Sequence, residues 1–275
     1  MLYRSIVRTP LALLSACVLA LGAVTAAQGQ GGTGVPEDPA VPLNPCLGLE
    51  AAELLCPNLR MQPPSDLRVS TTRSGRRLLH ATNSIDSRGE GPAELRGKRN
   101  GKHYMEANQR IVLRGGGRRT VETPARLGFK NIPGQGGYWK YRDAGLFEIW
   151  TLDANDQPVA RVRVGPKQYY CLRDLVRTRA MAGSPRGRVY PACNQNRRVN
   201  AVTLGTSVGW SDVYPSSYHE QYIEVTGLRG RYGFFHIADP NNGIWENDED
   251  DNAAMTIVSL PSGRPLGTRG PMPRP

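Results

Sequence analysis

The stretch that decides the fold is residues 209–252, GWSDVYPSSYHEQYIEVTGLRGRYGFFHIADPNNGIWENDEDDN. It contains two runs rich in aromatic and β-branched residues, 222–228 and 232–238, which are separated by a Gly-Arg turn. Asp-Pro-Asn-Asn-Gly follows the second run, and a dense group of acidic residues comes next. Apolar runs bounded by Gly, Pro and Asn are typical of β-strands. The stretch therefore predicts a β-hairpin that leads into an acidic turn.

The rest of the chain repeats this pattern of short apolar runs and turns. It has 31 glycines and 22 prolines, and long apolar periodic helices are absent from the sequence. Many short strands with turn signals between them favour an all-β, antiparallel β-sandwich with long loops and little helix. The expected strands outside the opening stretch are 78–82, 93–95, 104–112, 125–129, 138–152, 159–164, 169–175 and 255–260.

The two ends of the chain differ from its middle. Arg4 and Arg8 precede an apolar stretch, 11–24, and small residues follow it, so residues 1–27 are predicted to be a secretory signal peptide. An uncleaved membrane anchor is the alternative, although the apolar stretch is short for a span. The protein is therefore expected to be secreted, extracellular or held in the cell envelope. Residues 28–56 are predicted to be a flexible Gly/Pro-rich linker, 57–260 the β-sandwich domain and 261–275 a disordered Pro-rich tail. Within the linker, 47–55 is expected to form one short helical turn if Cys46 pairs with Cys56.

Cysteine usage agrees with an exported protein. Cys17 lies in the expected signal peptide, which leaves four of the five cysteines for the mature chain. An even number in an exported chain predicts two disulfides. Sequence proximity favours Cys46–Cys56 and Cys171–Cys193, although three pairings are possible.

The chain is strongly basic, with a formal net charge of +11 at pH 7. Positive charge outside a cell favours anionic surfaces, such as wall polymers, lipid headgroups or acidic proteins. The basic residues are scattered and match no DNA or RNA motif, so nucleic acid is not an expected partner. One hypothesis is therefore a non-catalytic, basic β-sandwich that binds anionic envelope or extracellular polymers. The basic residues occur in several short groups, and for each group taken alone a solvated loop is the alternative interpretation.

Four segments of the sequence are distinctive: NSI at 83–85 with GPAEL at 91–95, WKYRD at 139–143, KQYYC at 167–171, and GWSDVY at 209–214 with QYIEVTGL at 221–228. Together they resemble the lysyl oxidase family, in its bacterial branch, and they occur in the family's order across roughly 57–260. The first three are similar to the family's Gly-Pro-Leu-Glu-Leu strand, its Trp-His-x-Arg-Asp segment and its Lys-x-x-Phe-Cys segment. The fourth is the most specific, because many positions agree without gaps.

Members of this family oxidise the side-chain amine of peptidyl lysine, or small amines, to an aldehyde. They use copper and a lysine tyrosylquinone that is built from a lysine and a tyrosine of the enzyme itself. The resemblance implies that Lys167 and Tyr214 stand at these two catalytic positions. It also implies an extracellular protein or amine as the substrate. Taken without the resemblance, a solvated lysine and a half-buried aromatic are the simpler interpretations.

The family's copper-binding His-x-His-x-His run has no counterpart in this chain. Alternate residues of a strand share one face, so that spacing brings three imidazoles to one metal. Alignment on the Trp-x-x-Arg-Asp segment places Gly136, Tyr138 and Lys140 at the three positions, and 131–150 contains no histidine. We therefore expect impaired or absent amine oxidase activity. The four histidines are far apart in sequence, at His80, His103, His219 and His236.

The acidic group at 246–252 resembles the family's Glu-x-Asp-x-x-Asn-Asn loop, which binds calcium in some members. Carboxylate and amide oxygens at a turn are suitable ligands for this hard cation. A solvated acidic turn is the alternative, although its charges would repel one another without a cation. The expected calcium ligands are Asn58, Leu59 through its carbonyl, Glu246, Asp248, Asp251 and Asn252.

Overall fold

The computed structural model of the chain describes residues 43–101 and 104–275. The expected signal peptide, most of the expected linker and His103 lie outside the described residues. Within those residues, no helix is long and apolar enough to cross a membrane. The helical content of the same part of the chain is two short 3-10 turns, η1 (Pro45–Leu47) and η2 (Ala51–Glu53).

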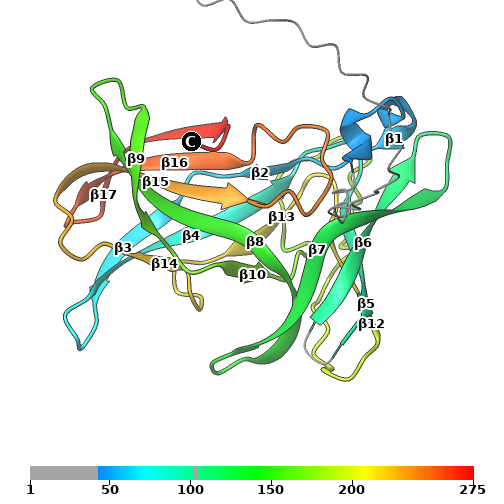
Figure 1. Cartoon of the computed structure of the whole chain (residues 1–275), viewed down its shortest axis with the longest axis horizontal. Coiled ribbons are helices and arrows are strands. Elements are labelled where there is room, and N and C mark those ends of the chain that lie inside the picture. Colours follow the sequence, from blue (N-terminus) through cyan, green and yellow to red (C-terminus); the bar gives the residue numbers. More distant parts are fainter. Residues whose placement is uncertain (1–42, 102–103) are drawn as a thin grey trace, which may run out of the picture. The chain divides into compact units, whose positions relative to one another are not determined.

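The fold is all-β, as the sequence predicts, and its strands form two antiparallel sheets (Figure 1). The larger sheet has the order β12 (Ala201–Thr206), β5 (Ala93–Arg99), β6 (Tyr104–Leu113), β7 (Arg118–Ile132), β8 (Gly136–Leu152), β15 (Gly230–Ala238), β16 (Ala253–Leu260), β17 (Arg264–Met272), with β1 (Leu54–Leu55) on β6 and both β9 (Pro158–Val164) and β10 (Gln168–Tyr170) on β8. The smaller sheet has the order β11 (Val176–Arg177), β13 (Trp210–Tyr214), β4 (Arg77–Ser87), β14 (Tyr222–Glu224), with β2 (Leu59–Met61) and β3 (Ser65–Thr71) on β4.

The long strand β8 joins the two halves of the larger sheet. Its first residues pair with β7 and its later residues pair with β15, so in Figure 1 it runs from the β5–β7 group to the β15–β17 group. One part of the core lies between this sheet and the smaller one, where Phe147 and Phe234 pack with Leu79 and Ile223. Apolar side chains that alternate along both sheets and meet in this way make the sandwich.

The two runs of the opening stretch are not paired with each other, so the predicted hairpin is wrong. β14 pairs with β4, with Ile223 opposite Leu79, whereas β15 pairs with β8 and β16. Ile223 and Val225 are buried in the core between the sheets, and so is Phe234 from the facing sheet. The chain therefore crosses from one sheet to the other after β14. The acidic turn connects β15 to its true neighbour, β16.

The structured part of the chain is wider than the predicted domain limits of 57 and 260. Residues assigned to the flexible linker form η1, η2 and β1, and Cys46 and Cys56 are buried beside Trp245. Part of the expected disordered tail is strand β17, which pairs with β16. β17 forms hydrogen bonds with backbone groups of β16 that would otherwise be exposed at a sheet edge. The Pro and Gly content of the segment gives no sign of this pairing. The described residues, from 43 onward, belong to one compact unit.

Both disulfides favoured by sequence proximity are present, Cys46–Cys56 and Cys171–Cys193. The second begins directly after β10 and ties down the loop that follows it. The Asn194 carbonyl in that loop accepts a hydrogen bond of 2.9 Å from the Trp139 amide, and the Asn196 carbonyl accepts one of 3.0 Å from the Trp139 indole. The loop is therefore fixed against β8.

Candidate functional site

Tyr214 lies at the end of β13, inside the largest apolar core cluster, and only 3% of it is exposed. Its ring stacks on Tyr170 with ring centroids 4.1 Å apart, and its hydroxyl accepts a hydrogen bond of 2.9 Å from the Cys171 amide. Tyr218 contacts the ring edge-on at 5.0 Å. Two further buried groups, Lys140 and Asp212, complete an assembly that we call the Tyr214 cluster.

The strand geometry explains how Asp212 and Tyr214 reach the same place. Residues two apart on a strand project from one face, and both side chains are buried on β13. Gly209 precedes the strand with a φ of +77°, and a Cβ there would lie 2.0 Å from the Arg179 carbonyl oxygen. Only glycine fits this turn, so it fixes the start of β13 and with it the direction of both side chains.

Lys140 brings a buried ammonium to the cluster from β8. The residue is 2% exposed, its Nζ donates a hydrogen bond of 2.9 Å to the Tyr218 hydroxyl, and it lies 5.5 Å from the Tyr214 ring centroid. Burial lowers the pKa of Lys140 to about 8, although the Asp212 carboxylate opposes this effect. The tyrosine faces partly replace the lost hydration of the cation.

Asp212 is the only carboxylate of the Tyr214 cluster, and it is fully buried. Burial raises the pKa of Asp212 to about 7, and the opposing effects of Arg173, Tyr214 and Lys140 are smaller. Neither carboxylate oxygen makes a hydrogen bond of normal geometry, so its interaction with Tyr214 is weak. Burial and the Asp212 charge raise the pKa of Tyr214 well above its ordinary value. Tyr214 is therefore a protonated phenol at neutral pH.

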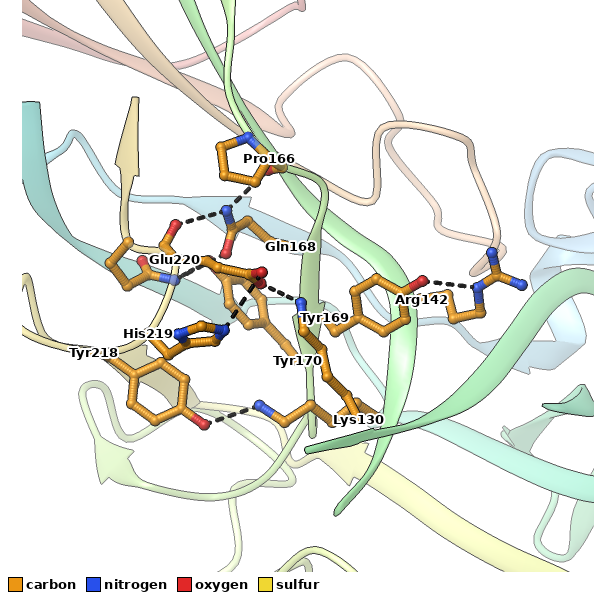
Figure 2. A network of polar contacts seen from close by, with 11 residues as sticks. Lys130, Arg142, Pro166, Gln168, Tyr169, Tyr170, Tyr218, His219 and Glu220 are labelled. Carbon is orange, nitrogen blue, oxygen red and sulfur yellow. Dashed lines mark hydrogen bonds and ion pairs between the residues drawn. The ribbon is translucent and has the colours of Figure 1, made fainter. Parts of the chain in front are cut away.

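The loop after Tyr214 is held over the cluster by a polar network (Figure 2). The Gln168 amide donates hydrogen bonds of 2.9 Å to the carbonyls of Pro166 and Glu220. The Glu220 carboxylate forms an ion pair with Lys130 and lies 3.4 Å from His219 Nε2. These contacts attach the loop to β10 and β7, so that Tyr218 remains in place against the Tyr214 ring.

The two predicted catalytic residues have different surroundings in the structure. The Lys167 side chain is 67% exposed, and its Nζ lies 3.4 Å from Asp143 Oδ2. Tyr214 is buried beneath the surface and contacts Tyr170, Tyr218 and Cys171 instead. Among the described residues, no hydrogen bond, ion pair or ring contact links Lys167 to Tyr214.

The three positions that match the copper-binding histidines do not fit copper. Gly136 has no side chain, and the Tyr138 hydroxyl is used in a hydrogen bond of 2.8 Å to the Gln135 carbonyl. Lys140 presents an ammonium, which has no lone pair while it is protonated. Among 43–101 and 104–275, no three His, Cys, Asp or Glu side chains converge as a metal-binding group. The histidines there are also apart: His80 is on β4, His219 in a loop and His236 on β15.

Hydrogen bonds link several of the predicted calcium ligands at one place, which we call the acidic turn: residues 246–252 with Asn58 and Leu59. Leu59 takes part through its amide and not through the predicted carbonyl, and the carboxylates of the described residues do not converge in a group of three. Glu246 is fully buried, and its carboxylate accepts hydrogen bonds from the Leu59 amide and, at 3.0 Å, from the Asn252 side chain. The Asp251 carboxylate accepts a hydrogen bond of 3.2 Å from the Asn58 amide. Asp248 accepts one of 3.0 Å from the Asp250 backbone.

Several oxygens of the acidic turn are buried without a hydrogen-bond donor. They are Oδ1 of Asn58, Asp251 and Asn252, and Oε2 of Glu249. Burial and the charges of Asp239 and Glu249 raise the pKa of Glu246 well above its ordinary value, and burial is also the main cause that raises the pKa of Glu249 to about 7. Oxygens of this kind fit a hard cation, which would relieve the repulsion among the carboxylates. Arg60, which pairs with Asp251, supplies part of the countercharge.

Sequence reasoning missed four members of these sites: Tyr170, Asp212, Tyr218 and Glu249. Asp212 had a usable signal, since it is two residues before Tyr214 on a predicted strand. The Asn44 side chain donates hydrogen bonds to the Glu246 carbonyl at 2.9 Å and to Glu249 at 2.8 Å. That contact spans more than two hundred residues and leaves no local pattern in the sequence.

No protein-family model matches the sequence, and no curated protein matches it either.

Proposed function

We propose that the chain is an exported, lysyl-oxidase-like β-sandwich protein that lacks copper amine oxidase activity. The observation that carries this proposal is the buried Lys140 ammonium, 5.5 Å from the Tyr214 ring centroid. The four ordered sequence resemblances support the relationship, and the two disulfides agree with an oxidising compartment. The family's role is the oxidation of lysine or other primary amines with copper and lysine tyrosylquinone. Under this proposal the chain shares ancestry with the family but does not carry out that reaction.

Two physical reasons support the loss of activity. A cation beside Tyr214 repels a copper ion, and the low polarity of the buried cluster strengthens that repulsion. Lys167 also points to solvent beside Asp143, so the cross-link to Tyr214 that forms the quinone would require both residues to move. Without the quinone, Tyr214 acts as a packed aromatic within the core.

The proposal predicts that the purified protein contains no stoichiometric copper and no quinone. After incubation with Cu²⁺ and dialysis, we expect copper far below one per chain by elemental analysis. We also expect no visible absorption band and no amine-dependent release of peroxide. Tyr214→Phe is the matched control, because it removes only the hydroxyl needed to form the quinone, and its spectrum should equal that of the unmodified protein. Stoichiometric copper with a quinone band that Tyr214→Phe abolishes would refute the proposal.

We further propose that the acidic turn binds calcium. The orphaned oxygens of Asn58, Asp251, Asn252 and Glu249 support this, together with the raised pKa values of Glu246 and Glu249. Calcium would be held by carboxylate and amide oxygens, and its chemistry there would be structural, because it would join β2 to the connection between β15 and β16.

Calcium is expected to raise the melting temperature of the protein. At a free concentration of about 100 times Kd, binding to the native state adds about 2.7 kcal/mol of stability. For a domain of this size that corresponds to roughly 5–10 °C, which differential scanning fluorimetry would measure after removal of metal with EDTA. Glu246→Gln should abolish most of the rise, whereas Glu53→Gln, which changes a carboxylate on η2, should leave it intact. A rise that survives Glu246→Gln would place the ion elsewhere, and no rise at millimolar calcium would refute the proposal.

The binding of anionic envelope or extracellular polymers is a second candidate function, because it needs no catalytic centre. The observation that favours it is a groove on the larger sheet whose lining includes Arg96, Lys98 and Arg99 and no acidic side chain. Polymer binding through positive charge weakens steeply with salt. A column of immobilised anionic polymer that retains the protein at low salt and releases it at high salt would support this candidate.

A further inference from the structure

The groove lies where β12, β5, β6 and β7 form one end of the larger sheet, and its volume is about 740 Å³. Arg96 and Lys98 are exposed and lie two residues apart on β5, so they project from the same face. In register, Thr203 of β12 lies opposite Arg96 on one side, and Asn108 of β6 lies opposite it on the other. Cations and hydrogen-bonding groups therefore alternate across the groove.

A buried carboxylate beside the groove gathers more positive charge than it neutralises. Glu94 is 2% exposed, and it accepts hydrogen bonds of 2.7 Å from Arg96 Nε and 3.0 Å from Arg118 Nη1. Arg110 Nη1 lies 4.0 Å from the same carboxylate. One negative charge thus faces three guanidinium groups, all at least a third exposed to solvent. The surplus of positive charge, with rigid positions set by Glu94, makes an anion-binding surface.

The remaining lining indicates what kind of anion fits. Asn108, Thr120 and Thr203 supply amide and hydroxyl groups that hydrogen-bond to sugar hydroxyls. The lining includes no aromatic side chain, whereas single-stranded nucleic acid is bound by stacking on aromatic rings. The surface is also hollowed and carries no large apolar side chain to enter a bilayer, which distinguishes it from a membrane-binding face.

We propose that this groove binds an acidic polysaccharide, a sugar polymer whose units carry carboxylate or phosphate groups. The proposal rests on the second candidate function above and assigns it to one site. Glu106, opposite Lys98 in register, and Glu122, opposite Asn108, border the groove on β6 and β7. These two carboxylates repel an anionic chain, so the polymer lies toward β12 and reaches β7 only near Thr120.

The test is a binding titration of the full chain with polygalacturonate, which carries carboxylates, and with a phosphorylated mannan. Unmodified mannan is the neutral control. The double variant Arg96→Gln/Lys98→Gln should weaken binding by about tenfold or more and reduce the slope of log K against log salt by about two. Glu106→Gln should instead tighten binding by a few-fold, since it removes a repulsive charge and no contact. The double variant should lose more affinity for one of the two polymers. That polymer shows whether the groove prefers carboxylate or phosphate groups.

The matched control is Arg229→Gln/Arg264→Gln, which removes the same charge from exposed positions on the β15–β17 side of the sheet. Its affinity should change by less than about twofold. Equal losses in the two double variants would overturn the groove but leave general anionic binding, and no binding at low salt would overturn both. Tighter binding of single-stranded DNA or phosphatidylglycerol vesicles would also overturn it. Should the double variant fail to fold, NMR spectra of the unmodified protein titrated with the polymer test the proposal. Changes in the backbone amide chemical shifts of Lys98, Asn108 and Thr203 would support the groove, and unchanged shifts there would overturn it.

Discussion

Asp212→Asn is expected to make the protein more stable than the unmodified chain at neutral pH, by up to roughly 4 kcal/mol. Asp212 is fully buried, and burial raises its pKa from the ordinary 3.8 to about 7. Its ionised form in the native protein therefore costs about 1.4 kcal/mol for each pKa unit of that difference. Asparagine keeps the shape of the neutral carboxyl and cannot ionise.

The sign of the effect follows from proton binding. Between pH 3.8 and about 7, the native state keeps a proton on Asp212 while the unfolded chain has released it. Stability therefore falls as the pH rises through this window, and the fall is complete once Asp212 is ionised in both states. Lys140 acts in the opposite direction at higher pH, since its pKa is lowered to about 8 and the unfolded chain then binds the extra proton. The comparison is therefore sharpest between pH 4 and pH 7.5.

Urea denaturation at a series of pH values measures this prediction. The unmodified protein and Asp212→Asn should have similar stability near pH 4 and diverge steadily toward pH 7.5. Other carboxylates with raised pKa values, such as Glu249, contribute the same slope to both proteins and cancel in the difference. Glu106→Gln, at an exposed position on β6, is the control and should give a profile parallel to that of the unmodified chain. Parallel profiles for Asp212→Asn would show that the native carboxyl is not held neutral.

The sequence predicts the local parts of this fold well. Apolar runs became β6, β8 and β15 because alternation and turn residues act within a few positions. The disulfide pairing also followed sequence proximity. Partner choice was not predictable in the same way: β14 and β15 are consecutive, yet burial of Ile223 and Phe234 from opposite sheets separates them. β17 was hidden for a related reason, because pairing with β16 outweighs its Gly- and Pro-rich composition.

In the candidate sites too, the features set by neighbouring residues could be predicted, whereas those set by long-range contacts could not. The sequence resemblance aligns Lys140 with a histidine position of another family, but it cannot show that the ammonium is buried against Tyr214 and Tyr218. It names Lys167 and Tyr214 together, but it cannot show that Lys167 is exposed beside Asp143 while Tyr214 is buried. The acidic turn was easier to predict from the sequence, because most of its oxygens lie within one short segment. Only Asn58 and Leu59 had to be joined to it from afar.

Removal of the Cys171–Cys193 disulfide is expected to destabilise the protein by roughly 3 kcal/mol, because it frees a loop of about two dozen residues in the unfolded chain. For a domain of this size, the melting temperature should fall by roughly 6–12 °C. The double variant Cys171→Ser/Cys193→Ser, followed by differential scanning calorimetry, measures the loss. A fall of less than about 2 °C would show that the native packing of the loop, and not the covalent link, restrains it.

The control is Cys46→Ser/Cys56→Ser, whose shorter loop should cost slightly less by the same entropic relation. The two variants should differ in where the native protein loosens. Cys193 precedes Asn194, whose carbonyl accepts the Trp139 amide, so loss of the second disulfide should speed hydrogen exchange at Trp139. Loss of the first should instead loosen the segment beside Trp245.

Because the Cys171 amide also donates a hydrogen bond to the Tyr214 hydroxyl, faster exchange at Trp139 accompanied by a changed Tyr214 environment would link the Cys171–Cys193 disulfide to the Tyr214 cluster. Unchanged exchange at Trp139 would mean that the loop is held by its own hydrogen bonds alone.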